Sequence, residues 1–419
     1  MSKQERTARV LLIAGFLVGF ALKVVMLFYM GVFDMDAYYD WGKRALELGL
    51  PASYHGIYFP LQYQIFEVCA WLVPRLGLQF FTVFKIANLA FDLASFVVLL
   101  ALLKRHGLNP LYALTYWIHP WFLAVFSLGY VDFQFTFFIL LSIWLLRSAS
   151  TMNYLPAGFA LGCAFLMKPQ TQILIIAAFV YCLLRYVRSK ETRSFAILAG
   201  PTFLFLCYEV WFGSAHTSAT TLARAAVLPL SYLDISNVMP ALTAQMTNIW
   251  YPIGYLLKAS GQPVLSVSDQ IQVLPGISVK YIAAAFVLSL VAIQVWRIER
   301  ADTLDAGERF ALIFGFAALV VPFFMTSGHE NHLFLGTVLL VPLVARAASG
   351  RTLIAFHLLL LVQFLHIYSL YGNQPARLAE LLRRTQSDEL AVIYSLIALG
   401  CFALLLKPLS PSTRASDLR

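Results

Sequence analysis

The chain has 419 residues, of which 60% are hydrophobic and 12% are charged, and its formal net charge is +9. This composition excludes an ordinary soluble globular domain and predicts a polytopic membrane protein. The basic residues fall mostly between hydrophobic runs, so we read them as topology signals and expect no nucleic-acid partner. The five cysteines form no C-x-x-C pair and lie mostly in apolar runs, which favours core residues over a metal or disulfide set.

The first predicted span covers residues 8–32 and is long enough to cross a bilayer. It has no small-residue cleavage signature, so we expect a retained anchor. Three cations at its leading end place that end in the cytoplasm: Lys3, Arg6 and Arg9. Asp34 and Asp36 should therefore emerge at the outer interface, beside aromatic rings that suit headgroup depth.

The outer segment 33–80 follows, with interfacial helices expected in it, one of them over 61–76. Further hydrophobic stretches are 81–103, 110–128, a fourth ending at Arg147, 155–167, 171–184, 195–212, 281–296, 310–325, 333–344, 353–371 and 390–406. The pattern predicts an all-α membrane protein with about twelve transmembrane helices and both termini cytoplasmic. We expect one domain over residues 1–419, with outer loops 33–80 and 213–279 forming its active-site face.

Polar residues gather on the predicted outer side: Asp34, Asp36, Tyr58, Asp132, Lys168, Arg224, His329 and Glu330. Carboxylates with cations nearby suit the attack of an acceptor hydroxyl on a lipid-phosphate-linked sugar. The leaving lipid phosphate is a stable anion that needs no acid catalyst, so one carboxylate base and groups that bind phosphate would suffice. A glycosidase would need two carboxyl groups in opposed roles.

Several motifs in this order resemble those of the GT-C glycosyltransferases, in particular the dolichyl-phosphate-glucose-dependent glucosyltransferases of N-glycan assembly and their bacterial relatives. The acidic motif of the first outer loop is similar to Asp34-Met35-Asp36 with Trp41, followed by Tyr58-Phe59-Pro60-Leu61. Later elements resemble Gly129-Tyr130-Val131-Asp132-Phe133-Gln134-Phe135, Met167-Lys168-Pro169-Gln170, Arg224 to Pro229, Asn248 to Trp250, and His329-Glu330-Asn331. Asn331 stands where the family has lysine, and one proline stands where it has two.

The resemblance implies a GT-C fold and an inverting transferase that moves a hexose from a polyprenyl-phosphate sugar to a glycan, lipid or protein acceptor. Asp34 and Asp36 would be catalytic, with Asp34 as the general base. The donor and its phosphate would be bound by His329, Glu330, Arg224, Lys168, Tyr58, Asp132, Gln134 and Trp250. We expect no cofactor and metal-independent activity, with a divalent cation left open. The expected location is a prokaryotic plasma membrane with the active site outside.

Other readings stay open at this point. Asp36 and Asp40 also fit solvated loop acids, and Lys168 also fits a cation that anchors a helix end. The pair His329 and His332 lacks the HExxH spacing, so zinc is not expected.

Asp92 and Glu209 lie within spans, where they would be functional or would pair with Lys85 and other spans. Arg224 is either a phosphate ligand or a loop cation. A polytopic lipid or sugar transporter or flippase is the alternative function. A membrane scaffold would leave the acidic motif unexplained.

Overall fold

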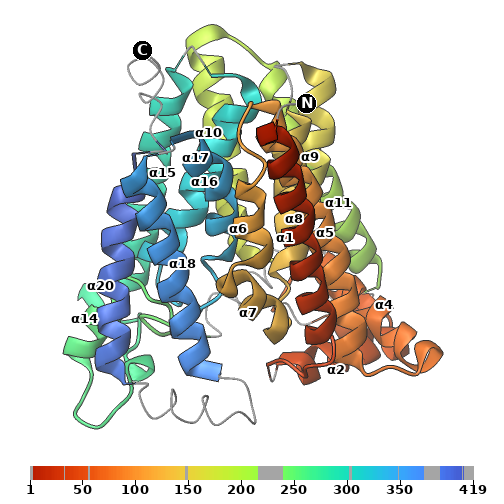
Figure 1. Ribbon diagram of the computed structural model, residues 1–419. Coiled ribbons are helices and arrows are strands. Elements are labelled where there is room, and N and C mark those ends of the chain that lie inside the picture. The colour runs from red at the N-terminus through yellow and green to blue at the C-terminus, as the bar shows by residue number, and fades with distance from the viewer. Residues whose placement is uncertain are drawn as a thin grey trace. The chain divides into compact units, whose positions relative to one another are not determined.

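The structure is a computed structural model that describes residues 3–32, 34–54, 57–146, 150–215, 239–301, 304–347, 349–371, 387–407 and 409. These residues are mainly helical (Figure 1), and their strands are the short hairpin β1 (Gln272–Leu274) and β2 (Ile277–Ser278). The all-α prediction is confirmed at this level.

Contacts divide the chain into two compact units. Unit 1 comprises residues 1–102, 125–238 and 305–307, and unit 2 comprises residues 103–124, 239–304 and 308–419. The single domain expected over residues 1–419 therefore stays a prediction, and each unit is described by itself.

Unit 1 is built from helices at the N-terminal side of the chain: α1 (Lys3–Met26), α2 (Asp34–Leu48), α3 (Leu50–Ser53), α4 (Pro60–Leu76), most of α5 (Phe80–Arg105), α8 (Asp132–Leu145), α9 (Thr151–Phe165), the 3-10 turns η1 (Pro169–Thr171) and η2 (Arg193–Phe195), α10 (Gln172–Ser189) and α11 (Ala196–Ala215). Helices α9 and α11 cross closely, because a Cβ on Gly158 would lie 2.3 Å from the Ile197 carbonyl oxygen. Small residues at helix crossings permit this approach.

Unit 2 holds α6 (Tyr112–Ile118), α14 (Trp250–Leu257), the 3-10 turn η3 (Val264–Ser266), α15 (Val279–Glu299), most of α16 (Ala306–Phe324), α17 (Phe334–Ala347), α18 (Gly350–Tyr371) and α20 (Asp388–Leu405). Helix α7 (Pro120–Leu128) begins in unit 2 and ends in unit 1. The hairpin of β1 and β2 leads directly into α15.

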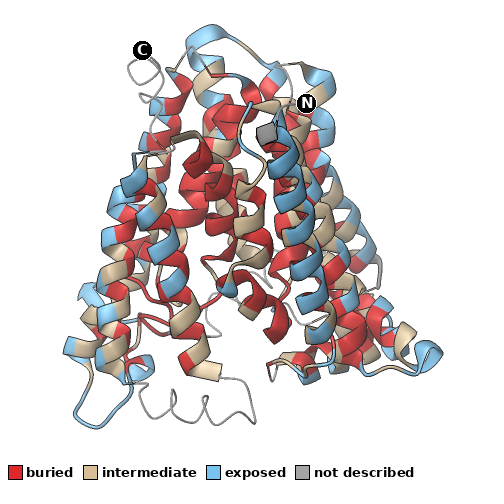
Figure 2. Ribbon diagram, viewed as in Figure 1, coloured by how far each residue is buried: buried red, intermediate tan, exposed pale blue. Residues whose placement is uncertain are grey.

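Eight helical segments of the described chain are long and apolar enough to span a membrane. They include α1, α5, α15, α16, α18 and α20, while α8 and α17 are shorter apolar helices. Much of α1 is exposed (Figure 2). Its exposed residues include the large apolar Val10 and Val25, as expected of a helix that faces lipid. These features are compatible with a multi-pass membrane protein, and the count of twelve spans stays a prediction.

Two predicted span boundaries were wrong, at residues 110–128 and at the end of the first span. The span expected over 110–128 is divided into α6 and α7 at His119, whose backbone is extended because the next residue is Pro120. The span expected to reach residue 32 ends at Met26, and a turn follows it. The segment 33–80, which we predict to lie outside, is largely helical, with α4 covering the helix expected over 61–76.

A buried ion pair joins α1 to α5 in unit 1. The Lys23 Nζ lies 2.5 Å from the Asp92 Oδ2, and both side chains are fully buried. Lys85, which we considered as a partner of Asp92, instead donates a 2.5 Å hydrogen bond to the Ser127 carbonyl oxygen and further ones to those of Met26 and Tyr29. Buried charges require such partners, so α1 is fixed to the unit at Lys23.

Candidate functional site

The corner between α1 and α2 places Asp34. The Val32 amide donates to the Leu128 carbonyl oxygen at 3.0 Å. Gly31 has a φ of 95°, and a Cβ there would lie 2.6 Å from that same oxygen. Only glycine suits both the left-handed conformation and the close approach. The corner therefore starts α2 at Asp34 in a fixed position.

Helix α2 has one buried face: Met35, Tyr38, Gly42 and Ala45. Their spacing of three or four residues is that of an amphipathic helix. Asp34 is half-buried at the first position of the helix, whereas Asp36 and Asp40 are exposed. Asp40 is paired with Lys43 at 2.9 Å on the exposed face. Asp34 is thus better shielded from water than Asp36, and the catalytic role of either stays a prediction.

Tyr38 is a buried tyrosine of α2 whose hydroxyl has a polar partner. Its hydroxyl shares a 3.0 Å hydrogen bond with that of Tyr58, which precedes α4. Burial raises the pKa of Tyr38 well above its usual value, and Tyr58, Asp34 and Asp132 raise it further. Because charges act on a phenol only from nearby, Tyr38 lies within electrostatic reach of both carboxylates. The Tyr38 hydroxyl is therefore bound directly to that of Tyr58 and is influenced electrostatically by Asp34 and Asp132.

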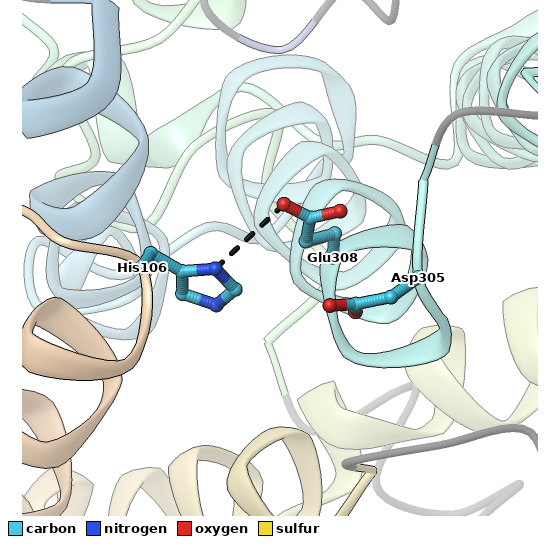
Figure 3. Close-up of side chains that lie close together, drawn as sticks. All are labelled: His106, Asp305 and Glu308. Carbon is cyan, nitrogen blue, oxygen red and sulfur yellow. Dashed lines mark ion pairs between the residues drawn. The ribbon is translucent and has the colours of Figure 1, made fainter.

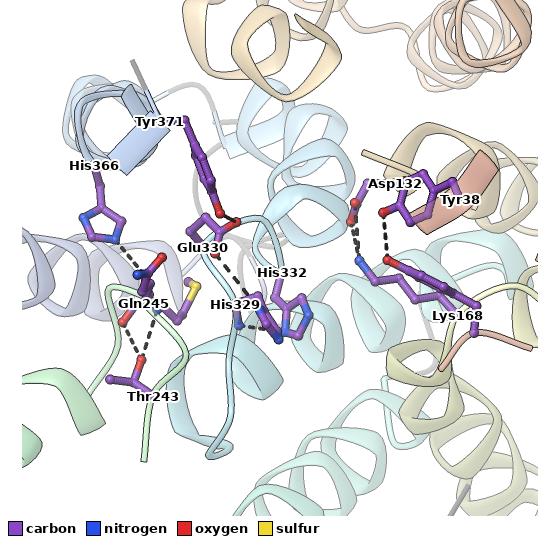
Figure 4. Close-up of polar contacts among 12 residues, drawn as sticks. Tyr38, Asp132, Lys168, Thr243, Gln245, His329, Glu330, His332, His366 and Tyr371 are labelled. Atoms are coloured by element: carbon purple, nitrogen blue, oxygen red, sulfur yellow. Dashed lines mark hydrogen bonds and ion pairs between the residues drawn. The ribbon is translucent and has the colours of Figure 1, made fainter. Parts of the chain in front are cut away.

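Lys168 is bound to Asp132 (Figure 4). The Lys168 Nζ lies 3.1 Å from Oδ1 and 3.3 Å from Oδ2 of Asp132, and both residues are buried. Asp132 begins α8, and Lys168 immediately precedes η1. Of the predicted site residues, these two are brought into direct contact. A phosphate at this point would have to share the Lys168 ammonium with Asp132.

Gln134 belongs to a buried chain of amide groups. Its Oε1 accepts from the Gln62 Nε2 at 2.9 Å, and its Nε2 donates to the Asn88 Oδ1 at 2.7 Å. The Asn88 Nδ2 in turn donates to the Tyr130 carbonyl oxygen at 3.0 Å. The chain joins α4, α5 and α8. Both amide atoms of Gln134 bind protein, so its local role is to hold these helices behind Asp132, and substrate binding by Gln134 stays a prediction.

In unit 2, His329 and Glu330 lie on the turn before α17 (Figure 4). The His329 side chain is 39% exposed, and its Nδ1 lies 4.0 Å from the Glu330 Oε2. Glu330 is buried and accepts a 2.8 Å hydrogen bond from the Tyr371 hydroxyl. The His332 Nδ1 accepts from the His329 amide at 3.2 Å. These bonds leave the His329 ring at the surface, where it can meet an anion.

A segment over residues 241–248 supports this turn. Ala244 and Gln245 form bridges with His329, and the Gly328 carbonyl oxygen accepts from the Ala244 amide at 2.9 Å. Gln245 has a φ of 69°, and its carbonyl oxygen lies 2.6 Å from the His366 Nε2 on α18. The turn is therefore tied to α18 on one side and to this segment on the other.

Trp250 begins α14 and is tied to α16. Its indole Nε1 donates to the Phe324 carbonyl oxygen at 2.7 Å, and its amide donates to the Asn248 Oδ1 at 3.0 Å. The Asn248 Nδ2 donates to the Pro322 carbonyl oxygen at 3.2 Å. The Asn-x-Trp spacing thus has a structural use at the end of α16, and donor binding by Trp250 stays a prediction. Arg224 lies outside the described residues.

A second charged group in unit 2 surrounds Glu308. The His106 Nδ1 lies 3.7 Å from the Glu308 Oε1 (Figure 3), and the Arg346 Nη1 lies 3.3 Å from the same oxygen. Arginine supplies a permanent positive charge to this buried carboxylate. Glu308 therefore has two basic partners at the beginning of α16, an arrangement that fits a structural cluster of ion pairs.

Sequence reasoning missed Tyr38 and Tyr371 as members of these polar groups. Tyr38 follows Asp34 by four residues, which on a helix places both on one side. If residues 34–48 are predicted as a helix, this four-residue spacing predicts that Tyr38 lies near Asp34. No sequence spacing connects Tyr371 to Glu330, 41 positions earlier.

The chain was compared with known proteins in three ways. No family model, no curated protein and no solved structure matches it.

Proposed function

We propose that the chain is an inverting glycosyltransferase that moves a hexose from a polyprenyl-phosphate sugar to an acceptor at the outer face of a membrane. The observation that carries the proposal is the placement of Asp34. Its half-buried carboxylate stands at the beginning of α2, directly after the corner that ends the first apolar helix. A lipid-linked donor presents its reacting carbon at that level, beside the headgroups.

In the proposed reaction the acceptor hydroxyl attacks the anomeric carbon of the donor sugar. A bond forms between the acceptor oxygen and that carbon, and the bond from the carbon to the phosphate oxygen breaks on the opposite face. Asp34 takes the hydroxyl proton, and the lipid phosphate leaves as an anion without an acid. One base therefore suffices, which fits a site in which Asp34 is half-buried and the nearby acid Asp36 is exposed.

The surroundings of Asp34 support this assignment within unit 1. Tyr38 and Tyr58 supply hydroxyl groups. Lys168 supplies a cation, although its ion pair with Asp132 as a whole has little net charge. A phosphate that replaces part of the Asp132 contact would regain a charge-assisted hydrogen bond from Lys168. Predicted phosphate binding by His329 belongs to unit 2 and has its own support in the exposure of its ring.

A transporter or flippase is the second candidate, and the Lys23 and Asp92 pair favours it. Charged residues buried between apolar helices commonly mark ion or substrate pathways. The glycosyltransferase is preferred because more polar groups are linked to α2. Tyr38 is hydrogen-bonded to Tyr58 and is influenced electrostatically by Asp34 and by Asp132, which binds Lys168.

The test is incubation of the purified protein with a panel of labelled polyprenyl-phosphate sugars and measurement of released polyprenyl phosphate. Asp34→Asn should lower turnover by about 10²- to 10⁴-fold with donor binding retained. Asp36→Asn is the matched control, since it makes the same change two residues on at an exposed position, and it should lower turnover much less.

Normal turnover by a folded Asp34→Asn variant would reject Asp34 as the base. If no donor released polyprenyl phosphate and the protein moved lipid-linked or free sugar across the membrane of proteoliposomes, the transferase proposal would be rejected in favour of the transporter.

A further inference from the structure

The hairpin of β1 and β2 carries apolar side chains that the rest of the protein leaves uncovered. Four of its large residues are 42–58% exposed: Ile271, Val273, Leu274 and Ile277. The stretch 271–279 contains no charged residue. A short two-stranded hairpin has little stability of its own in water, and an exposed apolar patch usually marks an interaction surface. The hairpin therefore has the character of a docking element.

The apolar surface continues from the hairpin onto α15. That helix begins at Val279, directly after β2, and is long and apolar enough to span a membrane. Tyr281, Ile282 and Phe286 in its first turns are also exposed. A bilayer that surrounds α15 reaches its first turns, and the hairpin is attached there. This continuity identifies the occupant of the hairpin surface as lipid.

The base of the hairpin is held rigidly against the beginning of α15. The Val279 amide donates to the Ile271 carbonyl oxygen at 3.0 Å, and the Lys280 amide donates to the Asp269 carbonyl oxygen at 3.1 Å. Strands of three and two residues extend about 10 Å at most, at about 3.3 Å per residue. Interfacial elements enter a membrane to about 5–10 Å, so the reach of the hairpin matches that depth.

The hairpin edges limit how deep it can lie. β1 and β2 pair with each other, so their outer edges present backbone groups that hydrocarbon cannot satisfy. The boundary between headgroups and acyl chains offers both water and apolar contact. We propose that residues 271–278 form an interfacial anchor that inserts into the membrane surface beside α15.

The anchor is coupled to the turn that carries His329. Asp269 is fully buried, and its Oδ2 accepts from the Thr326 hydroxyl at 2.8 Å and from the Ser327 hydroxyl at 3.3 Å. Thr326 and Ser327 immediately precede Gly328 and His329. The anchor thus sets the depth of this turn relative to the lipid surface. Membrane insertion of the hairpin does not depend on the proposed enzymatic activity.

The test places a single nitroxide label on the full-length protein in lipid nanodiscs. The five native cysteines are replaced, and Leu274→Cys, Gln262→Cys and Phe286→Cys are labelled in turn. Gln262 is the matched control because it is exposed on the loop before η3, and Phe286 reports a lipid-facing position on α15. Power saturation compares the collision of each label with oxygen, which enters lipid, and with a water-soluble nickel chelate.

The label at Leu274 should be shielded from nickel and accessible to oxygen, at a level between the labels at Gln262 and Phe286. Nickel access equal to that at Gln262 would overturn the anchor, and so would shielding from both reagents, which would indicate a protein partner. Helicity and elution volume must match the cysteine-free parent. If Leu274→Cys alters them, Ile277→Cys, which pairs with Leu274 across the hairpin, carries the label instead.

Discussion

The buried pair of Lys23 and Asp92 gives the sharpest test of how unit 1 is held together. Their charged atoms are 2.5 Å apart, and both side chains have no exposed surface. At an effective dielectric constant of about 20, such a pair attracts by about 7 kcal/mol. Desolvation costs several kcal/mol for each ion and offsets this gain. The intact pair should therefore contribute little net stability.

Removal of one partner has a different effect. Lys23→Met removes the cation that the buried Asp92 carboxylate binds. Asp92→Leu removes the anion that the buried Lys23 ammonium binds. Each single variant should lower the free energy of unfolding by about 3–5 kcal/mol. The double variant removes both charges and replaces them by apolar groups of similar size, so its stability should return to that of the parent or exceed it.

Equilibrium unfolding in mixed micelles, with rising SDS and circular dichroism as the signal, measures these differences. Lys43→Met is the matched control, because Lys43 also pairs with a carboxylate, at 2.9 Å, but with both side chains exposed. It should leave the unfolding midpoint unchanged. A double variant as unstable as the single variants would refute the electrostatic reasoning and would leave shape complementarity at this position as the source of stability.

Further predictions concern the polar residues of unit 1, the metal dependence of the proposed activity and the membrane topology. Tyr38→Phe removes the hydrogen bond to Tyr58 and should lower the free energy of unfolding by about 0.5–1.5 kcal/mol at neutral pH. Because the pKa of Tyr38 is raised on folding, its ionisation in the unfolded chain destabilises the protein above pH 10, so the variant should lose less stability between pH 9 and 11 than the parent. Lys168→Met should cost about 3–5 kcal/mol by removing the cation that Asp132 binds, and Lys168→Arg should cost less, both measured by the same unfolding assay. Transferase activity should survive EDTA, and loss restored by magnesium or manganese would contradict this. A reporter at Gln262 should be modified from the outer side by an impermeant reagent, and labelling from the cytoplasmic side would reverse the topology.

The long helices could be predicted from the sequence because the signal for them is local. Helix α5 was expected over 81–103 and is found as Phe80–Arg105, since an apolar run ends at two cations. The segment 33–80 is predicted as an outer loop with interfacial helices, and its acidic part is instead the amphipathic helix α2. The spacing of Met35, Tyr38, Gly42 and Ala45 by three or four residues is the local signal for that helix.

The partners of the charged residues could not be predicted, because they depend on packing between distant segments. Lys168 meets Asp132 across 36 positions, and Lys23 meets Asp92 across 69 positions, an interval that includes the whole of α2 and α4. A sequence shows that a buried charge needs a partner. It does not show which helix supplies one.

The pairing of Lys168 with Asp132 limits how the candidate site of unit 1 can bind a phosphate. The resemblance to the glycosyltransferases predicts Lys168 as a phosphate ligand, yet its ammonium is bound to a buried carboxylate. In an apolar surrounding the pair is stable only while both charges are balanced. A donor phosphate that contacts Lys168 would add a negative charge to a neutral pair, so it would need compensation from a further cation or from hydroxyl groups. The Tyr38 hydroxyl shares a hydrogen bond with that of Tyr58 and is influenced electrostatically by Asp132, so under the proposed function we expect these phenols, more than the lysine, to offer the hydrogen bonds to an anion in unit 1.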